Sequence, residues 1–374
     1  MSAPAESPRP ARRKRRRSLI RPGIAVGAAF FLLFALARRS PALTESVYSR
    51  GIYPPLASAL AHVSAPLPFS LAELVFAAIP VAMAGSAVRS WRRARRDERS
   101  RARSALSALA GAAAAAGWAW AAFLGLWGFQ YARRGPAPLF EVSPAPKGDE
   151  TRTLLEQIGA RIDQIRTALP EDDRGVVRAP EDFRDLDRHI AELQREVLAE
   201  QALPLVRGGR AKRALASPLM LRWGVSGFYG PFTGEPNIVW PSPPAVLPFT
   251  IAHERAHLSG FAWEEDASFV GLLTTWRSPR AEVRYAGWFE LWLHVGRGAK
   301  GRAPGFARDL AAVSEFLRAH RGRESGAVWA TYSGYLKAHG VRGGVKNYRR
   351  AAALALGYLA ERGLPPEPLG GQAR

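Results

Sequence analysis

Two histidines and a glutamate in the pattern His-Glu-x-x-His are the residues of this 374-residue chain that most clearly allow chemistry. His253 and His257 lie four positions apart, so on an α-helix they share one face and stand about 6 Å apart along its axis. Two imidazoles placed in this way can bind one Zn²⁺ ion. Glu254 can then reach a water on the metal without being a ligand, which predicts a general base. The alternative is a surface helix on which both histidines are solvated.

A catalytic zinc site needs a third protein ligand and leaves its fourth position to water. The chain has no cysteine, so the third ligand must be a histidine or a carboxylate. Gly260 can end the metal helix just after His257, and an acidic run opens the next predicted helix. In this run we expect Glu264 to bind the zinc, with Glu265 as the second choice. Acidic residues that do not bind would still suit the positive end of the helix dipole.

Three apolar segments precede residue 130, and each is long enough to cross a bilayer. They predict a transmembrane region over residues 19–130 with spans at about 19–37, 69–88 and 104–128. No small-residue cleavage site follows the first segment, which favours an uncleaved helix over a signal peptide. The third span is rich in alanine and glycine, which lets helices pack closely in lipid. A buried soluble helix is the alternative for that run.

Basic residues flank these spans and account for much of the net charge of +21. The arm up to Arg21 holds eight Lys or Arg, the first loop three, and the linker between the second and third spans eight. Under the positive-inside rule the N-terminus is cytoplasmic, and the chain after about residue 129 lies outside the cytoplasm. The charge therefore indicates a multi-pass membrane protein with the lipid bilayer as its partner, for which we expect the bacterial inner membrane as the location, and argues against nucleic-acid binding.

The rest of the chain predicts a tether and a helical domain. Residues 1–18 are expected to form a disordered basic arm, residues 131–149 a tether, and residues 150–374 an extracytoplasmic domain with little β-structure. We therefore expect a mainly α fold, with short β-like pieces only between residues 204 and 248. The helices expected in the domain cover residues 150–169, 180–201, 248–258, 264–277, 280–297, 304–320, 325–339 and 344–362.

Four further segments carry a resemblance that extends beyond the metal motif. They are Tyr48–Pro54, Pro68–Leu74, Leu126–Arg133 and Gly227–Asn237. At these segments the chain resembles an uncharacterised bacterial family of three-pass membrane proteins with a zincin-type metallopeptidase site, over about residues 20–360. The resemblance implies a zincin-like outer domain, but no substrate.

The residues after the metal motif are similar to a second pattern, that of the gluzincins, in which the first Glu of Glu-x-x-Ala-Asp binds zinc. By position this residue is Glu264, which agrees with the choice made from spacing. The chain departs from the pattern at Ser268, where gluzincins have Asp. A serine there implies a weaker hydrogen bond to a metal ligand.

Several other residues are weaker candidates. Arg284, Tyr285 and His294 on the next predicted helix could stabilise an oxyanion, but ordinary helix surface or core is the alternative for each. Tyr229 and Glu235 lie in a loop that could border a cleft.

The leading functional hypothesis is a membrane-anchored zinc metallopeptidase that hydrolyses an envelope peptide or protein outside the cytoplasm. Zinc would polarise the scissile carbonyl, and Glu254 would take a proton from water and pass it to the leaving amine. The alternatives are a zinc-containing envelope sensor or transducer without turnover, and a cell-wall amidase.

Overall fold

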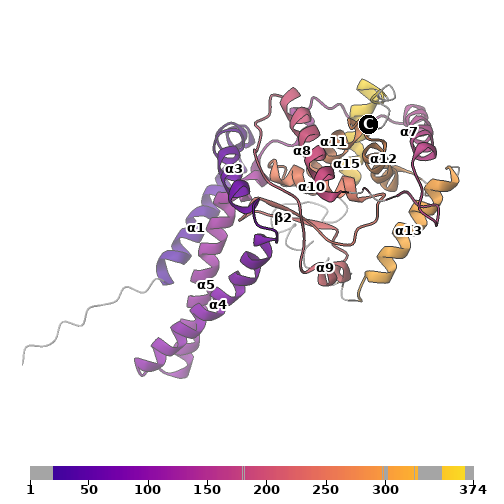
Figure 1. Cartoon of the computed structure of the whole chain (residues 1–374). Helices are drawn as coiled ribbons and strands as arrows, with labels where there is room; N and C mark the ends of the chain where they lie inside the picture. Colours follow the sequence, from indigo (N-terminus) through magenta and orange to yellow (C-terminus); the bar gives the residue numbers. More distant parts are fainter. Residues whose placement is uncertain are drawn as a thin grey trace, which may run out of the picture. The chain divides into compact units, whose positions relative to one another are not determined.

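The computed structural model describes residues 20–366 apart from 179, 181, 297, 299–301, 324 and 327–347 (Figure 1). The expected arm over residues 1–18 and most of the expected helix over 325–339 lie outside the described residues. The described chain falls into two compact units. One unit comprises residues 20–30 and Ile79–Ala121, and the other comprises Phe31–Ala78 and the residues from Ala122 onward.

Two helices are long and apolar enough to span a membrane, namely α4 (Leu71–Arg96) and α5 (Arg101–Leu126). They correspond to the second and third expected spans. The first apolar segment forms α1 (Ile20–Ala37), which supplies a third crossing only if residues 22–37 and 41–64, bent by 106°, are counted as one broken span.

Within the first unit, α1 and α5 approach closely through glycine. A Cβ atom added to Gly23 would lie 2.3 Å from the carbonyl oxygen of Ala114, and one added to Gly27 would lie 2.8 Å from the Cα of Gly117. The absence of side chains at these positions allows the two backbones to come this near, as expected for apolar helices that pack in lipid.

The second unit begins with the segment between the first two apolar helices. This segment is helical throughout, as α2 (Pro41–Leu43), the π-helical η1 (Thr44–Ile52) and α3 (Tyr53–Ser64). Tyr53 and Ala61 of α3 are almost fully buried, so α3 packs against the rest of this unit.

The expected tether over residues 131–149 is instead part of the folded domain. The chain forms a 3₁₀ turn, η2 (Gly128–Ala132), and a short helix, α6 (Pro136–Leu139). Phe140, 1% exposed, follows and packs against the rings of Phe261 and Phe269 at centroid distances of 6.2 and 5.5 Å. The proline content suggested an extended linker, but the large apolar side chain at its centre is buried in the core.

The remainder of the second unit is built mainly from helices, which confirms the predicted fold class. Most helix limits lie within a few residues of those expected. The described helices are α7 (Asp149–Ala168), α8 (Phe183–Glu200), α9 (Ser217–Trp223), α10 (Leu247–Leu258), α11 (Glu264–Trp276), α12 (Ala281–Val295), α13 (Pro304–His320) and α15 (Tyr348–Arg362).

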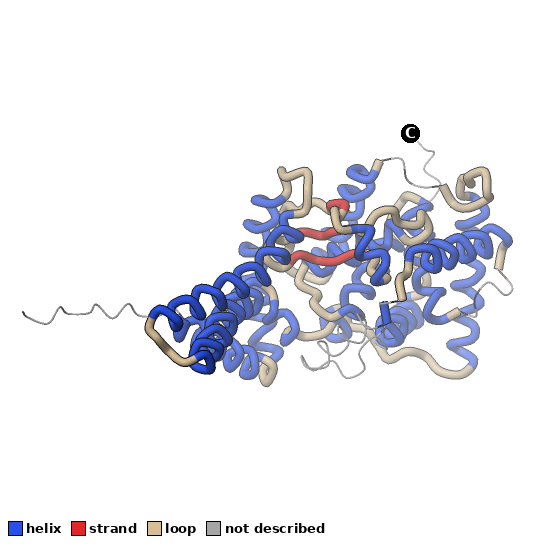
Figure 2. The backbone as a smooth tube through the Cα atoms, turned by 90° about the horizontal axis from the view of Figure 1, so that it is seen from below, coloured by secondary structure: helices blue, strands red, loops and turns tan. Residues whose placement is uncertain are grey.

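A small three-stranded sheet lies among these helices (Figure 2). Its strands are β1 (Lys212–Arg213), β2 (Gly227–Gly230) and β3 (Glu235–Ile238), in the order β1-β3-β2. β1 runs parallel to β3, and β2 runs antiparallel to it. β2 is therefore an edge strand of the described sheet, and both β2 and β3 contact α10.

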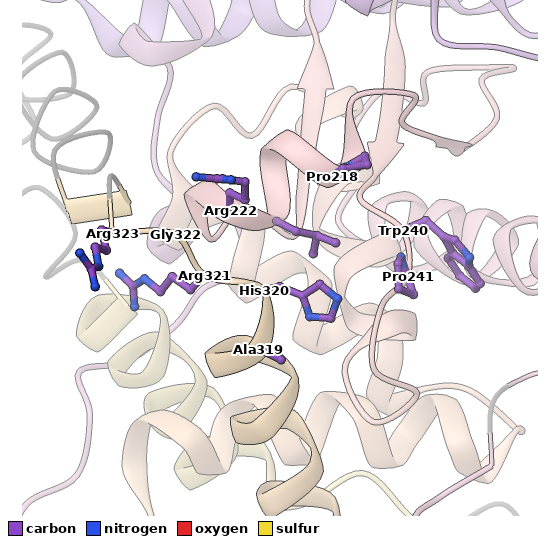
Figure 3. A pocket seen from close by; sticks show the side chains of 10 residues that line it. Pro218, Arg222, Trp240, Pro241, Ala319, His320, Arg321, Gly322 and Arg323 are labelled. Carbon is purple, nitrogen blue, oxygen red and sulfur yellow. The ribbon is translucent and has the colours of Figure 1, made fainter.

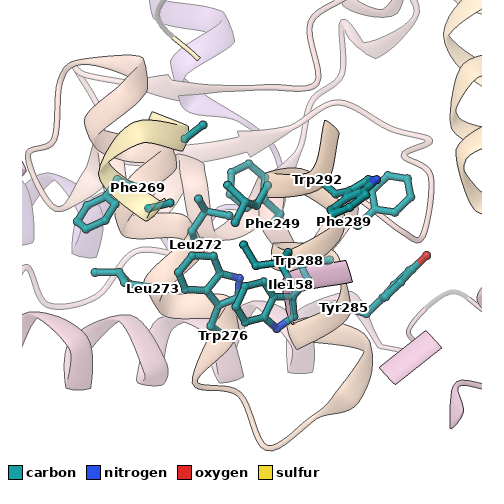
Figure 4. Close-up of a cluster of buried hydrophobic side chains, with 14 of the residues drawn as sticks. Ile158, Phe249, Phe269, Leu272, Leu273, Trp276, Tyr285, Trp288, Phe289 and Trp292 are labelled. Atoms are coloured by element: carbon teal, nitrogen blue, oxygen red, sulfur yellow. The ribbon is translucent and has the colours of Figure 1, made fainter. Parts of the chain in front are cut away.

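The core of the second unit surrounds α10, α11 and α12. Figure 4 shows Phe249 of α10 together with the large side chains of α11 and α12, which include the stacked rings of Trp276 and Trp288, 4.4 Å between centroids. Burying a large apolar side chain contributes about 1.5–3 kcal/mol relative to leaving it exposed. Every residue of α10 is buried, so this helix is fixed on all sides by packing.

Candidate metal centre

The helix α10 ends in the way that the sequence predicted. Gly260 has φ +88°, a left-handed conformation that glycine adopts at little cost. Its amide donates to the carbonyl of His257, and the amide of Phe261 donates to the carbonyl of Ala256, at 2.9 and 3.1 Å. These two bonds form a Schellman cap. The chain reverses through this cap, and α11 then begins at Glu264.

The reversal brings together the three residues that were predicted to bind a metal. Nε2 of His253 lies 3.1 Å from Oε2 of Glu264, and Nε2 of His257 lies 3.7 Å from the same oxygen. One possible ligand atom from each of the three lies within 4.8 Å of the other two. Glu265, the second choice, places its carboxylate near Arg350 at 3.4 Å. The solvated surface helix is excluded, because His253 and His257 are only 9% and 5% exposed.

Hydrogen bonds on the far side of each ring orient the two imidazoles. Nδ1 of His257 lies 2.7 Å from the carbonyl oxygen of Phe261. A carbonyl can only accept, so this nitrogen carries a proton, and in the neutral form of the ring the lone pair is on Nε2. Nδ1 of His253 lies 3.2 Å from Oγ of Ser268, the hydrogen bond that the sequence predicted for this serine. Both Nε2 atoms are thereby directed toward Glu264.

Glu254 is buried beside the cluster and does not belong to it. It is 4% exposed, and its Oε2 has no hydrogen-bond partner in the described part of the chain. Burial raises the pKa of Glu254 to about 7, although the two neighbouring imidazoles act to lower it. A Cβ atom at Gly227 of β2 would lie only 2.7 Å from Oε1 of Glu254. The edge strand thus passes directly over a carboxylate that is able to accept a proton.

The charges of the cluster depend strongly on one another. Burial disfavours a charge on Glu264, but hydrogen bonds from the two histidines outweigh it and hold the pKa of Glu264 well below its usual value. Burial also disfavours a charge on His257, but the carboxylate of Glu264 outweighs it and raises the pKa of His257 to about 9. Without a metal the cluster therefore holds a proton on His257 at neutral pH, and a metal ion that binds there would displace it.

Helix α8 supports α10 from the face opposite the cluster. Arg255 points away from the metal ligands, and its Nε donates to Oδ1 of Asp187 at 2.6 Å. Nε2 of Gln194 donates to the carbonyl of Ala252 at 2.9 Å. Sequence reasoning gave Asp187 and Gln194 no role, because nothing in their local pattern distinguishes them from other polar residues of an amphipathic helix.

Residues from before position 134 support the end of α10, and sequence reasoning did not predict their role. Tyr53 donates its hydroxyl to the carbonyl of Leu258 at 2.9 Å, and the indole of Trp127 donates to that of His257 at 3.4 Å. Arg133 donates to the carbonyl of Gly260 and forms a buried ion pair with Glu45, both at 2.9 Å.

One signal for these three donors existed. Tyr53, Trp127 and Arg133 all lie in segments that carried the resemblance to a family. Their contacts with α10 explain why residues so far from the metal motif in the sequence belong to the same pattern.

The weaker candidates on α12 are engaged elsewhere. Tyr285 donates its hydroxyl to Asp309 at 2.6 Å in the core, and Arg284 donates to the carbonyl of Ser278 at 2.7 Å. Nε2 of His294 lies 3.0 Å from Glu290. Of these three, none lines the cavity over the metal ligands, so the structure does not support them as oxyanion-stabilising groups.

Tyr229 and Glu235, the two candidates in the loop before the metal helix, lie in different surroundings. The ring of Tyr229 lies over that of His257 at a centroid distance of 6.5 Å, so this tyrosine borders the cluster. Glu235 is buried and forms an ion pair with Lys212. Its carboxylate also accepts from the amides of Leu71 and Ala72, at 3.2 and 2.6 Å, and so caps the start of α4.

A cavity of about 810 Å³ lies over the cluster and includes its three members and Glu254 in its lining. β2 contributes backbone and side chains to one side, and His320 at the end of α13 reaches the same cavity. Sequence reasoning missed His320, since a single histidine at the end of a helix gives no local signal of its own.

Comparison with known protein families identifies a match for most of the chain. The model of a family described as "Protein of unknown function (DUF3810)" matches residues 48–356. No curated protein and no solved structure matches the chain.

Proposed function

We propose that this chain, which belongs to the DUF3810 family of proteins of unknown function, is a membrane-anchored zinc metallopeptidase that hydrolyses a peptide or protein bond outside the cytoplasm. The membership agrees with the predicted resemblance to an uncharacterised family. The observation that carries the proposal is the buried carboxylate of Glu254, without a hydrogen-bond partner in the described chain, beside a cluster of two imidazoles and one carboxylate.

The donor set fits zinc. Two imidazole nitrogens and one carboxylate oxygen are ligands that zinc accepts, at about 2.0–2.2 Å each, so tetrahedral ligand atoms stand about 3.3 Å apart. The separations of 3.1 and 3.7 Å from Glu264 to the two histidines are close to this value. Three protein ligands are the number typical of a catalytic zinc, whereas structural sites have four.

In the proposed hydrolysis, three residues bind the metal and a fourth transfers the proton. His253, His257 and Glu264 would hold the zinc, which supplies a Lewis acid that polarises a carbonyl and acidifies water. Glu254 accepts the proton of the attacking water at its free Oε2 and transfers it to the departing amine. The hydroxyl of the water ends on the carbonyl carbon, and the C–N bond breaks. In the metal-free protein, burial raises the pKa of Glu254 above its usual value, which favours proton acceptance by this carboxylate.

The edge strand β2 favours a polypeptide as the substrate. Its residues Gly227–Tyr229 line the cavity beside Glu254, and β3 occupies only one edge of β2. An extended peptide can add to the edge that no described strand occupies and form backbone hydrogen bonds with it. Such binding would place a backbone carbonyl next to the metal ligands, and the volume of about 810 Å³ is enough for several residues.

Zinc-dependent peptide cleavage by the purified full-length protein tests the proposal. A mixture of peptides from a bacterial digest would be incubated with protein in detergent micelles, and new peptide ends would be identified by mass spectrometry. We expect about one zinc per chain, cleavage that stops after chelation, and recovery on re-addition of zinc. Zinc-loaded protein that cleaves no peptide would contradict the proposal and favour a sensor.

The location of the cavity can be tested with topology reporters. A reporter that works only in the cytoplasm should be silent when it is fused after residue 140, because the basic segments hold the N-terminus and the 89–103 linker inside. The same reporter fused within that linker, after Arg96, should be active. Activity after residue 140 would move the cavity to the cytoplasmic side.

Replacement of Ser268 should weaken zinc binding without abolishing it. Ser268→Ala removes the hydrogen bond to Nδ1 of His253, and loss of such a partner behind a ligand typically costs about 10–100-fold in metal affinity. Ser259→Ala is the matched control, since Ser259 bonds to Gln194 and not to a ligand. Competition with a chromophoric chelator gives both affinities. Equal affinity in the two variants would show that Ser268 does not orient His253.

A further inference from the structure

An aromatic wall runs from the metal cluster to the helices α4 and α5. The ring of His257 lies 6.1 Å from that of Trp127, which lies 6.0 Å from Phe123. Phe123 lies 6.5 Å from Phe232, and Phe232 lies 6.2 Å from Phe76. Phe228 of β2 completes the wall, 6.0 Å from Phe76. We call Phe76, Phe123, Trp127, Phe228 and Phe232 the aromatic wall; all of them line the cavity.

The wall reaches the two helices that are apolar enough to span a membrane. Phe123 lies on the last turn of α5, and Phe76 lies on the second turn of α4. Glu73, three residues before Phe76, directs its carboxylate to the amides of Leu215 and Ala216 at 2.8 and 2.7 Å. A carboxylate is costly in hydrocarbon, so Glu73 marks the polar boundary. Phe76 is then about 4.5 Å further along the helix, in its apolar part.

Helix α9 lies at the same boundary, because Glu73 binds the residues just before it. Leu215 and Leu219 expose apolar side chains, with 66% and 46% of their surface accessible. Met220, Leu221 and Trp223 of the same helix line the cavity. Apolar residues exposed on a helix that begins at the polar boundary are typical of a segment that lies in the interface of a bilayer.

Basic residues accompany this interfacial helix. Figure 3 shows Arg222 of α9 with Arg321 and Arg323 at a second hollow, of about 740 Å³, which shares Leu221, Pro241 and His320 with the cavity. Arginine at the level of the headgroups can bury its stem and direct its charge toward lipid phosphates. The charge and the exposed leucines together place α9 against an anionic membrane surface.

We infer that the substrate is a polypeptide anchored in the outer leaflet by an apolar segment and cleaved just where it leaves the bilayer. This inference rests on the proposed peptidase function. The substrate enters the cavity from the membrane side, between α9 and the ends of α4 and α5, and its apolar side chains follow the aromatic wall to Glu254. The free edge of β2 binds its backbone, and Phe228 of the same strand connects this edge to the wall.

The occupant is a polypeptide because β2 supplies backbone donors and acceptors along the same path. An acyl chain would use the wall but would leave these groups without a partner, and unsatisfied polar groups oppose its binding. A soluble peptide would use β2 but would gain nothing from a wall that continues to the bilayer. Only a polypeptide that emerges from the membrane uses both features.

Two matched peptides test the inference on full-length protein in vesicles of phosphatidylethanolamine and phosphatidylglycerol. Both carry the sequence that is cleaved fastest in the peptide mixture, or Gly-Phe-Leu-Gly-Phe-Leu if none is cleaved. One continues into an apolar segment of about 20 leucines and alanines, and the other into a glycine-serine linker of equal length. We expect kcat/KM to be at least about 10-fold higher for the anchored peptide. Equal cleavage of both would overturn the inference and leave the peptidase function standing.

A pair of variants on one helix identifies the wall as the cause. Phe76→Gln should reduce the ratio of kcat/KM for the anchored peptide to that for the soluble one, because Phe76 belongs to the wall. Leu74→Gln should leave the ratio unchanged, since Leu74 is also exposed on α4 but does not line the cavity. If the ratio of the two kcat/KM values is the same in Phe76→Gln as in the wild type, the substrate does not enter along the aromatic wall and the inference is overturned.

A binding measurement keeps the inference testable if neither peptide is cleaved, an outcome that would count against the peptidase function alone. The chain has no cysteine, so Phe232→Cys can carry a single fluorescent label on the wall. We expect a quencher on the anchored peptide to quench this label at concentrations at which the soluble peptide does not. Full quenching by phospholipids with brominated acyl chains, with no further effect of the anchored peptide, would show that the occupant is lipid and overturn the inference.

Discussion

Glu254→Gln is expected to lower peptide hydrolysis by about 10²–10⁴-fold while zinc remains bound, the effect typical of losing a positioned acid–base group. Glutamine has the same size and is neutral at all relevant pH values, so the buried position is still filled. The three cluster residues are unchanged, and the pair of hydrogen bonds behind the imidazoles is unaffected. Zinc content and kcat/KM, measured on the same preparation, check both parts of the expectation.

The same variant separates catalysis from metal binding in the cell. If the protein turns over a substrate, a deletion strain that carries Glu254→Gln should behave like the deletion itself. Full complementation by this variant would contradict the peptidase proposal and favour an envelope sensor. A cell-wall amidase would also lose function in the variant, but purified wild-type protein would then cleave wall peptides and not polypeptides.

Glu264→Ala is expected to reduce the zinc content from about one ion per chain to almost none, whereas Glu265→Ala should retain it. Glu264 supplies the oxygen nearest to both histidines, and two imidazoles alone form an incomplete site. Glu265 lies one position further on and pairs with Arg350. Metal analysis of the two variants after identical dialysis, with circular dichroism to verify folding, is the measurement.

The opposite pattern would reassign the third ligand. Zinc loss in Glu265→Ala with retention in Glu264→Ala would mean that the first turn of α11 rotates when metal binds. Retention in both variants would show that the histidines bind metal with a ligand from elsewhere, and His257→Ala would then decide whether the motif binds zinc at all.

The cluster could be predicted from the sequence because it depends on local geometry. The spacing of His253 and His257 fixes a shared helical face, Gly260 permits the left-handed cap, and Glu264 then begins the next helix within reach. Each of these features involves residues that are close in sequence, so helix periodicity and cap geometry are enough to predict it. The same periodicity placed the helices of the domain within a few residues of their observed limits.

The surroundings of the cluster could not be predicted, because they depend on contacts between distant segments. Nothing near Arg133 indicates that it binds both Glu45 and Gly260. The segment around Phe140 has the composition of a linker, yet Phe140 is buried against Phe261 and Phe269. The content of proline and glycine indicates only the local backbone conformation. Whether such a segment is an extended linker or part of the folded domain depends on tertiary packing.

Tyr53, Trp127 and Arg133 donate hydrogen bonds to the end of α10. The order in which the ribosome makes these residues and α10 determines when these hydrogen bonds can form. Tyr53 and Leu258, which share a hydrogen bond, are 205 residues apart. At about 5–20 residues per second, a ribosome needs about 10–40 s to make the second after the first. Tyr53, Trp127 and Arg133 are therefore delivered to the membrane before their partners exist. The hydrogen bonds at the end of α10 can form only after both partners have been made, so under the proposed function a nascent chain has no completed site with which to damage other proteins.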